Sequence, residues 1–439
     1  GAVNFMRLFD TLIDVTKQGA TRRGSFAAYL PIDHPDAEEF LDIKTDGNPI
    51  QNLFFAVTVK DEWLQSMVDG DAAKRTLWAK VLQQRSEIGL PYIVFEDAAN
   101  RGAADVYQAK GMRIRSSNLC SEIMLPVAED ESFVCCLSSL NLLHFDEWKD
   151  TDAAETLTYF LDAVMSEFIE KSDDAPGLQR ANTFAKRHRA LGVGVLGWHS
   201  YLQENMVPIG GLDAVMRNRQ VFKHIRNATY AASSDLAQRY GEPELLDGFG
   251  RRNSTLMAIA PTTSSSFILG QVSQSIEPLR SNYYVKDLAK SVTTYRNPRL
   301  QRLLAERGHD TPSVWRSILE HDGSVRHLSV LDDHERSVFA TFAEVLRRRS
   351  RGRADCGCFG DASAPVRDRG VGRPPTTRRR RSRSPPAARR PPAARTRAPP
   401  GRAWRSVDRR SVRARSPARS RPPARPARRG GGPARTVAS

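Results

Sequence analysis

The 439-residue chain has few cysteines and no long apolar run. Its opening ten residues lack the apolar core of a signal peptide, and apolar stretches such as residues 191–196 fall far short of the roughly 20 residues of a membrane helix. No disulfide-framework spacing links the five cysteines, which are Cys120, Cys135, Cys136, Cys356 and Cys358. These absences exclude a disulfide-stapled secreted domain and a membrane partner, and they predict a cytoplasmic protein.

The last 94 residues lack whole classes of side chain. Residues 346–439 contain no Lys, Asn, Ile, Tyr, Met, Gln or Glu, but they hold 29 Arg, 4 Asp and 14 of the 26 Pro. Their net charge of +25 leaves −9 for residues 1–345, out of a total of +16. A segment with so few large apolar side chains cannot form a core, so we predict a disordered tail.

The origin of this tail has two explanations. Arg, Pro, Ala, Gly and Ser are encoded largely by G/C-rich codons, which favours a frameshift product over a selected RNA-binding arm. The alternative is a basic-tailed nucleic-acid-binding protein that contacts phosphates. Since Phe359 and Trp404 are its only aromatic residues, the tail offers little base stacking, and we expect only nonspecific nucleic-acid binding.

Residues 1–345 alternate between helical and strand-like patterns. Apolar spacing predicts helices over residues 6–17, around 157–168, from Pro176 onward and over 332–346. Strand-like stretches lie at residues 52–59, 91–95, 132–137 and 254–260. This alternation predicts an α/β fold class.

One short stretch, residues 116–123, carries candidate chemistry. In an extended strand, Asn118, Cys120 and Glu122 project to one side, which places a thiol between an amide and a carboxylate. A buried cysteine on an ordinary strand is the alternative explanation of this triplet taken alone.

The same stretch, SNLCSEI, closely resembles the finger loop of class I ribonucleotide reductases. Four further stretches occur in the order of that family, so that the resemblance covers roughly residues 15–344. Residues 23–30 resemble the strand after the first active-site loop, and residues 134–142 resemble the strand with one redox-active cysteine. Residues 189–195 resemble a helix of the family. Residues 252–266 resemble the phosphate loop, and residues 275–278 resemble the segment that follows that loop. The resemblance implies that residues 1–345 form an incomplete ten-stranded α/β barrel of the catalytic α subunit.

The resemblance assigns roles to single residues. Cys120 would become a thiyl radical that removes the ribose 3′-hydrogen, Glu122 would act as general base, and Asn118 would hold the sugar. Cys135 matches one half of the dithiol that supplies two electrons. The resemblance implies that the other half comes from a strand upstream of residue 1. Cys136 is a poor substitute, since it should face the opposite side of the strand.

Substrate phosphates would bind to a hydroxyl run and a glycine. The run follows Pro261 at an expected helix start, where hydroxyls and free N–H groups can hold a diphosphate, although a plain N-cap is the alternative. Residues 192–197 also satisfy G-x-G-x-x-G, but they follow a helical, basic stretch, which argues against a dinucleotide site. The substrate-binding candidates are Gly24, Thr262, Thr263, Ser264, Ser265 and Ser266.

The resemblance also implies partners. The chain would bind no cofactor directly: a dimetal β subunit would supply the radical, and a dithiol of the thioredoxin or glutaredoxin type would supply electrons. The complete α subunit would form a homodimer regulated by dNTP and ATP effectors, with residues 46–52 as the loop that transmits effector identity. Because no radical-transfer tyrosine pair or cysteine tail is recognisable, we expect this chain to be inactive alone. An adenosylcobalamin-dependent relative is the nearest alternative enzyme.

Overall fold

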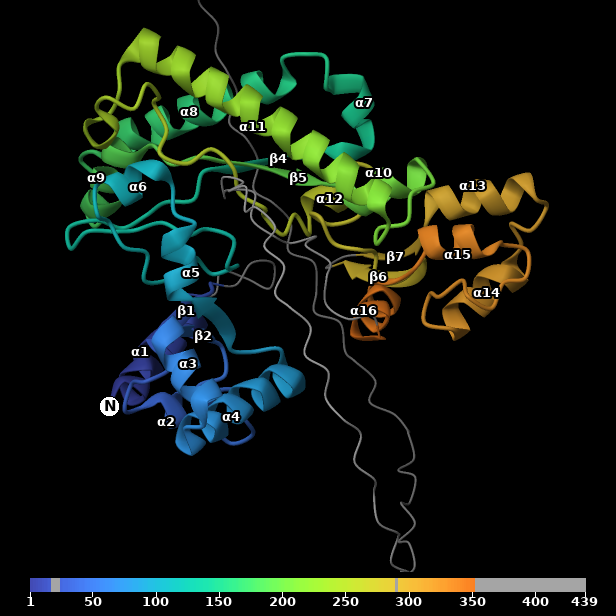
Figure 1. Cartoon of the computed structure of the whole chain (residues 1–439), viewed down its shortest axis with the longest axis horizontal. Helices are drawn as coiled ribbons and strands as arrows, with labels where there is room; N and C mark the ends of the chain where they lie inside the picture. Colours follow the sequence, from blue (N-terminus) through green and yellow to red (C-terminus); the bar gives the residue numbers. More distant parts are fainter. Residues whose placement is uncertain (17–23, 289–290, 352–439) are drawn as a thin grey trace, which may run out of the picture. The chain divides into compact units, whose positions relative to one another are not determined.

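The computed structural model describes residues 1–16, 24–288 and 291–351 (Figure 1). All of them belong to one compact unit, Gly1–Arg367. The second unit, Asp368–Ser439, and with it nearly all of the tail predicted at residues 346–439, lies outside the described residues. Among the described residues, no helix is both long enough and apolar enough to cross a lipid bilayer.

A three-stranded parallel sheet forms the first part of the chain, with strand order β1-β2-β3. Its central strand is apolar almost throughout and nearly fully buried, as expected for a strand covered on both faces. The predicted strands at residues 52–59 and 91–95 are confirmed, shortened by one or two residues. The elements are α1 (Ala2–Val15), β1 (Ala27–Pro31), α2 (Ala37–Leu41), β2 (Phe54–Val59), α3 (Asp61–Asp69), α4 (Ala72–Ile88) and β3 (Tyr92–Phe95).

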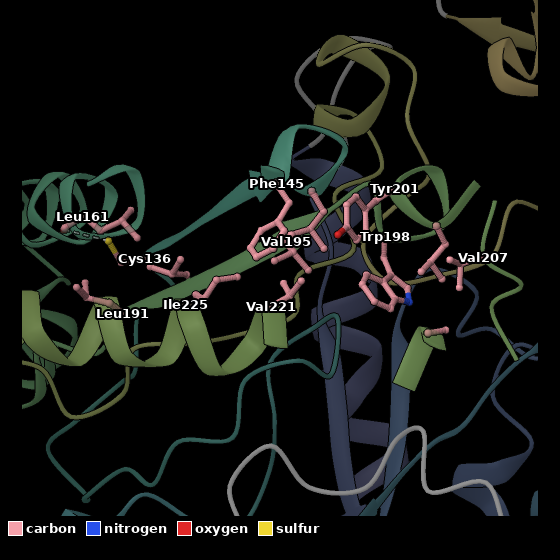
Figure 2. Packing of buried hydrophobic residues seen from close by; sticks show 14 of the residues in the cluster. Cys136, Phe145, Leu161, Leu191, Val195, Trp198, Tyr201, Val207, Val221 and Ile225 are labelled. Carbon is pink, nitrogen blue, oxygen red and sulfur yellow. Dashed lines mark hydrogen bonds between the residues drawn. The ribbon is translucent and has the colours of Figure 1, made fainter. Parts of the chain in front are cut away.

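A parallel strand pair, β4 (Leu137–Asn141) and β5 (Gly192–Leu196), lies at the centre of the next part. The helix α8 (Ala153–Ser172) packs on both strands and against α11 (Leu212–Tyr240). Figure 2 shows the apolar cluster between them. The other elements here are α5 (Glu96–Arg101), α6 (Asp105–Ala109), η1 (Leu142–His144), α7 (Phe145–Trp148), α9 (Gln179–His188), α10 (Trp198–Glu204), η2 (Glu244–Leu246) and α12 (Ser265–Ile268).

Two glycines of β5 let another backbone segment approach closely. A Cβ atom on Gly194 would lie 2.3 Å from the carbonyl oxygen of Ala258, and one on Gly192 would lie 2.8 Å from the Ala258 Cβ. The approaching segment forms a parallel bridge with Val193, whose amide donates to the carbonyl of Leu256 at 2.7 Å. The stretch that leads to residues 262–266 is therefore fixed against β5.

The last described part contains an antiparallel pair and four helices. Leu300, Trp315 and Phe339 belong to its own apolar cluster. Its elements are β6 (Tyr283–Leu288), β7 (Ser291–Arg296), α13 (Pro298–Glu306), α14 (Pro312–Glu320), α15 (Asp333–Val338) and α16 (Phe342–Arg351). The helix α16 crosses the domain boundary predicted at residue 345.

Several local predictions are wrong. Residues 189–195, expected to be helical, contain β5, because Gly192 and Gly194 are poor helix formers and fit the close approach described above. The expected strand at 132–137 begins only at Leu137, and the one at 254–260 makes a single bridge, at Met257. The helix expected from Pro176 begins at Gln179.

The helix expected over residues 332–346 is divided into α15 and α16. The Thr341 amide and hydroxyl both donate to the Glu344 carboxylate, at 2.7 and 3.1 Å. This pairing starts a new helix, much as an N-terminal cap does, and so interrupts the apolar periodicity.

Candidate functional site

Cys120 lies in a tight turn and not in an extended strand, which corrects the expected period-two geometry. Asn118 makes the turn's backbone bonds: its amide donates to the Ile123 carbonyl at 3.3 Å, and its carbonyl accepts from the Ser121 amide at 3.1 Å. Its side-chain oxygen accepts from the Ile123 amide at 3.1 Å. Ser121 is left-handed, with φ of 67°. The asparagine side chain competes successfully with strand pairing, as is common for Asn in turns.

The turn nevertheless gathers the four predicted catalytic residues. The Asn118 side chain hydrogen-bonds with the Cys135 thiol, and Cys135 lies within electrostatic reach of both Cys120 and Glu122. Both thiols are exposed. The Glu122 oxygen Oε2 is buried and has no hydrogen-bond partner among the described residues. Two accessible thiols therefore flank a carboxylate with one free acceptor.

The electrostatics of the turn keep both thiols protonated. Burial, and then the Glu122 carboxylate, raises the pKa of Cys120. The same two effects raise the pKa of Cys135, although the hydrogen bond from Asn118 opposes them. A thiol that keeps its proton is suited to losing a hydrogen atom rather than a proton.

Cys136 faces away from this turn, as predicted. Its sulfur lies 3.5 Å from the Leu161 carbonyl oxygen within the apolar cluster (Figure 2). Burial raises its pKa to about 11. It does not replace a second redox thiol at the site.

Sequence reasoning missed two tyrosines beside the turn. The Tyr29 hydroxyl donates to the Asn118 carbonyl at 2.5 Å and lies 2.8 Å from the Ser117 Oγ. Tyr92 is within electrostatic reach of both Cys120 and Tyr29. Tyr29 falls within a stretch that carries the family resemblance, but no sequence signal links it to a turn 88 residues away.

The hydroxyl run is only partly available to a ligand. Thr262 has φ of 50°, and its hydroxyl accepts from the Ser275 amide at 2.8 Å. The buried Ser266 donates to the Thr262 carbonyl at 2.7 Å. Thr263, Ser264 and Ser265 are exposed. The two ends of the run thus fix the loop. Its middle presents three exposed hydroxyls for which the described residues supply no hydrogen-bond partner.

The remaining candidates lie in the first part of the chain. Gly24 is exposed and precedes β1, and a Cβ there would lie 3.4 Å from Thr16 Oγ1. Asp10 of α1 holds the end of the 46–52 loop, because its carboxylate accepts from the Asn52 amide at 2.7 Å and from the Leu53 amide at 3.0 Å. The hydrogen bonds of the described residues join neither Gly24 nor the 262–266 loop to the Cys120 turn.

Comparisons with known proteins identify the family of the chain. The barrel domain family of ribonucleotide reductase matches residues 1–74, 66–248 and 243–351. The ribonucleoside-diphosphate reductase large subunit of Invertebrate iridescent virus 3 is 35% identical over 424 residues, covering 79% of this chain and 67% of the relative. A large subunit assigned to the same enzyme in Frog virus 3 (isolate Goorha) is 36% identical over 368 residues, covering 79% of this chain.

A solved structure is similar over the same region. The Actinobacillus ureae class Id ribonucleotide reductase alpha subunit has 58% sequence identity and a TM-score of 0.74, and the match covers 78% of this chain. The chain spans 63% of that structure and 65% of the Frog virus 3 relative. The fold is therefore the α/β fold of ribonucleotide reductases, and the chain belongs to the ribonucleotide reductase barrel-domain family.

Proposed function

We propose that the chain is the catalytic barrel of a ribonucleoside-diphosphate reductase large subunit, which reduces ribonucleotides to 2′-deoxyribonucleotides for DNA synthesis. The single observation that carries the proposal is the gathering of Cys120, Cys135 and the unpaired Glu122 oxygen around one turn. The names of the similar large subunits support the same reaction.

The chemistry begins at Cys120. A sulfur radical there removes the 3′-hydrogen of the ribose and becomes a thiol, while the free oxygen of Glu122 takes the proton of the 3′-hydroxyl. The 2′-hydroxyl then leaves as water with a proton from one thiol of the dithiol, and C2′ receives a hydrogen atom from the other thiol. The two sulfurs join as a disulfide and pass the remaining electron to the 3′-keto group, while Glu122 returns its proton to the 3′-oxygen. Cys120 returns its hydrogen atom to C3′ in the last step, which restores the sulfur radical.

Two electrons are needed for this reduction, and a dithiol that becomes a disulfide provides them. Cys135 supplies one of the two thiols, held by its hydrogen bond with Asn118. Asn118 has two roles. Its side-chain oxygen accepts from the Ile123 amide and stabilises the turn, and its side chain also binds the sugar. Since Cys136 is committed to the apolar cluster, the 439-residue polypeptide does not complete multiple turnovers by itself.

The substrate diphosphate lies against the exposed middle of the hydroxyl run. Thr263, Ser264 and Ser265 offer hydroxyl donors, while Thr262 and Ser266 hold the loop in shape. Gly24 completes the substrate-binding set from the segment before β1. Backbone amides in such a loop favour anionic groups.

Partners supply what the barrel does not. A β subunit with a dimetal centre generates the radical, and a thioredoxin- or glutaredoxin-type dithiol restores the reduced state. The complete α subunit forms a homodimer, and dNTP and ATP effectors act through the 46–52 loop that Asp10 anchors.

Equilibrium dialysis tests the substrate assignment without requiring turnover. Cytidine diphosphate should bind the purified chain more tightly than cytidine. The Ser264→Ala, Ser265→Ala double variant should weaken that binding roughly a hundred-fold, as expected for two lost hydrogen bonds to a charged group at about 1.5 kcal/mol each. Ser313→Ala, in α14, is a control without effect. Equal binding of cytidine and its diphosphate contradicts the assignment, and multiple turnover by the purified polypeptide contradicts its proposed inactivity.

A further inference from the structure

We propose that Tyr29 is a positioning residue for Cys120: its hydroxyl binds the carbonyl that closes the turn and so sets where the thiol stands. The inference rests on the proposed function for its importance to the reaction, but its geometry stands independently.

The phenol contacts the two residues that lead into the tip of the turn. Its oxygen is 2.5 Å from the Asn118 carbonyl and 2.8 Å from the Ser117 hydroxyl on one flank. The Asn118 carbonyl that the phenol binds also accepts from the Ser121 amide at 3.1 Å. The phenol is therefore joined to the atom that closes the turn across its tip, Leu119 and Cys120.

The turn needs such support. Ser121 has φ of 67°, a left-handed conformation that non-glycine residues adopt at a cost. The turn's own backbone-directed hydrogen bonds all involve a single residue, Asn118. Without an outside partner, the turn would depend on the hydrogen bonds of this one residue.

The support is rigid because Tyr29 belongs to the parallel sheet. The pairing register places Tyr29 opposite Ala56 and Ala56 opposite Tyr92, so the three side chains form one row on one face. Ala56 is fully buried and small, which leaves space between the two rings. The phenol is thus fixed by β1 and not by a loop.

The same tyrosine keeps its proton. Burial is the largest effect on Tyr29 and raises its pKa, so its hydroxyl remains a donor to the Asn118 carbonyl at neutral pH. The titratable groups that face Cys120 are Glu122, Cys135, Tyr29 and Tyr92. Among them, only Tyr29 is joined to the carbonyl within the turn.

The test is the alkylation rate of Cys120 in the full chain, followed by mass spectrometry from pH 6 to 10 with iodoacetamide. Tyr29→Phe keeps the ring and removes the hydroxyl. We expect Cys120 to react roughly five-fold faster at pH 7.5, the factor for one lost hydrogen bond. The midpoint of its pH profile should move down, because an opened turn removes the partial burial that raises the pKa of this thiol.

Tyr92→Phe is the matched control, since it lies in the same row and no hydrogen bond among the described residues joins its hydroxyl to the turn. Its rate should stay within two-fold of the wild type. Ser117→Ala, which removes one partner of the same phenol, should give a smaller increase than Tyr29→Phe and serves as the test if Tyr29→Phe does not fold.

The proposal is overturned if Tyr29→Phe keeps the wild-type alkylation rate and pH midpoint of Cys120, or if Tyr92→Phe changes them by the same amount. If Tyr29→Phe does not fold, a wild-type alkylation rate and midpoint in Ser117→Ala overturn it instead. This result is separable from the proposed function. If the alkylation changes occur as expected but cytidine diphosphate does not bind, the positioning inference stands and the function fails.

Discussion

Replacing Gly194 by alanine tests whether β5 and residues 254–260 are held in direct backbone contact. The new Cβ would lie 2.3 Å from the Ala258 carbonyl oxygen and 3.2 Å from the Ser139 hydroxyl. Ordinary contact begins at 3.4 Å, so the segment must move by about 1 Å. The displaced atom belongs to backbone, which cannot rotate away as a flexible side chain could.

The cost has two parts. Overpacking of this kind costs about 1 to 3 kcal/mol. The shift also weakens two backbone hydrogen bonds, from Val193 to the Leu256 carbonyl at 2.7 Å and from Ala258 to the Val193 carbonyl at 3.3 Å. At about 1 kcal/mol for each bond, the free energy of unfolding should fall by about 3 to 5 kcal/mol in total.

Urea unfolding, followed by tryptophan fluorescence, measures this loss as a lower midpoint at an unchanged slope. Gly210→Ala is the control, because a Cβ there meets nothing within 4 Å. We expect the control to lie within about 0.5 kcal/mol of the wild type. A Gly194→Ala midpoint equal to that of the control would refute the close-contact reasoning.

Two predictions concern pH. Burial lowers the pKa of His199 to about 4, below the ordinary 6.5. Because the unfolded state then binds one more proton, the free energy of unfolding should fall as pH drops from 6.5 toward 4. His199→Gln should reduce this pH dependence, and an unchanged pH dependence would argue against a buried neutral imidazole. Hydrogen bonds from the 51–53 backbone and the Asn52 side chain lower the pKa of Asp10, so its contribution is present above about pH 4 and is lost as pH falls through the lowered folded-state pKa. Asp10→Asn should therefore lower the urea midpoint at pH 7, and this effect should shrink progressively as pH falls below about 4; an effect that stays the same down to the lowest pH at which the protein folds would contradict the ionised clamp.

Some of this architecture could be predicted from sequence because local pattern and tertiary environment agree. The run from Phe54 to Val59 is apolar and β-branched, and it forms a buried central strand. The grouping of Cys120, Glu122, Asn118 and Cys135 also followed from the resemblance, although the strand geometry assumed for it was wrong.

The rest depends on contacts between distant residues. Gly192 and Gly194 have no strand signal of their own, and only the approach of Ala258 explains them. The hydrogen bond from Tyr29 to Asn118 joins residues 89 positions apart. The turn itself arises because one Asn side chain satisfies an amide that strand pairing would otherwise use.

The most direct test of the central claim is a thiol-alkylation footprint of the purified chain with and without cytidine diphosphate, read by mass spectrometry at Cys120, Cys135 and Cys136. If Cys120 and Cys135 share one substrate site, saturating nucleotide should slow the alkylation of both in parallel, roughly ten-fold or more, as expected when about 90% of the sites are occupied. Cys136 should stay unreactive throughout, because it is buried. Unchanged reactivity of Cys120 and Cys135 at saturating nucleotide, or protection of one without the other, would contradict the account.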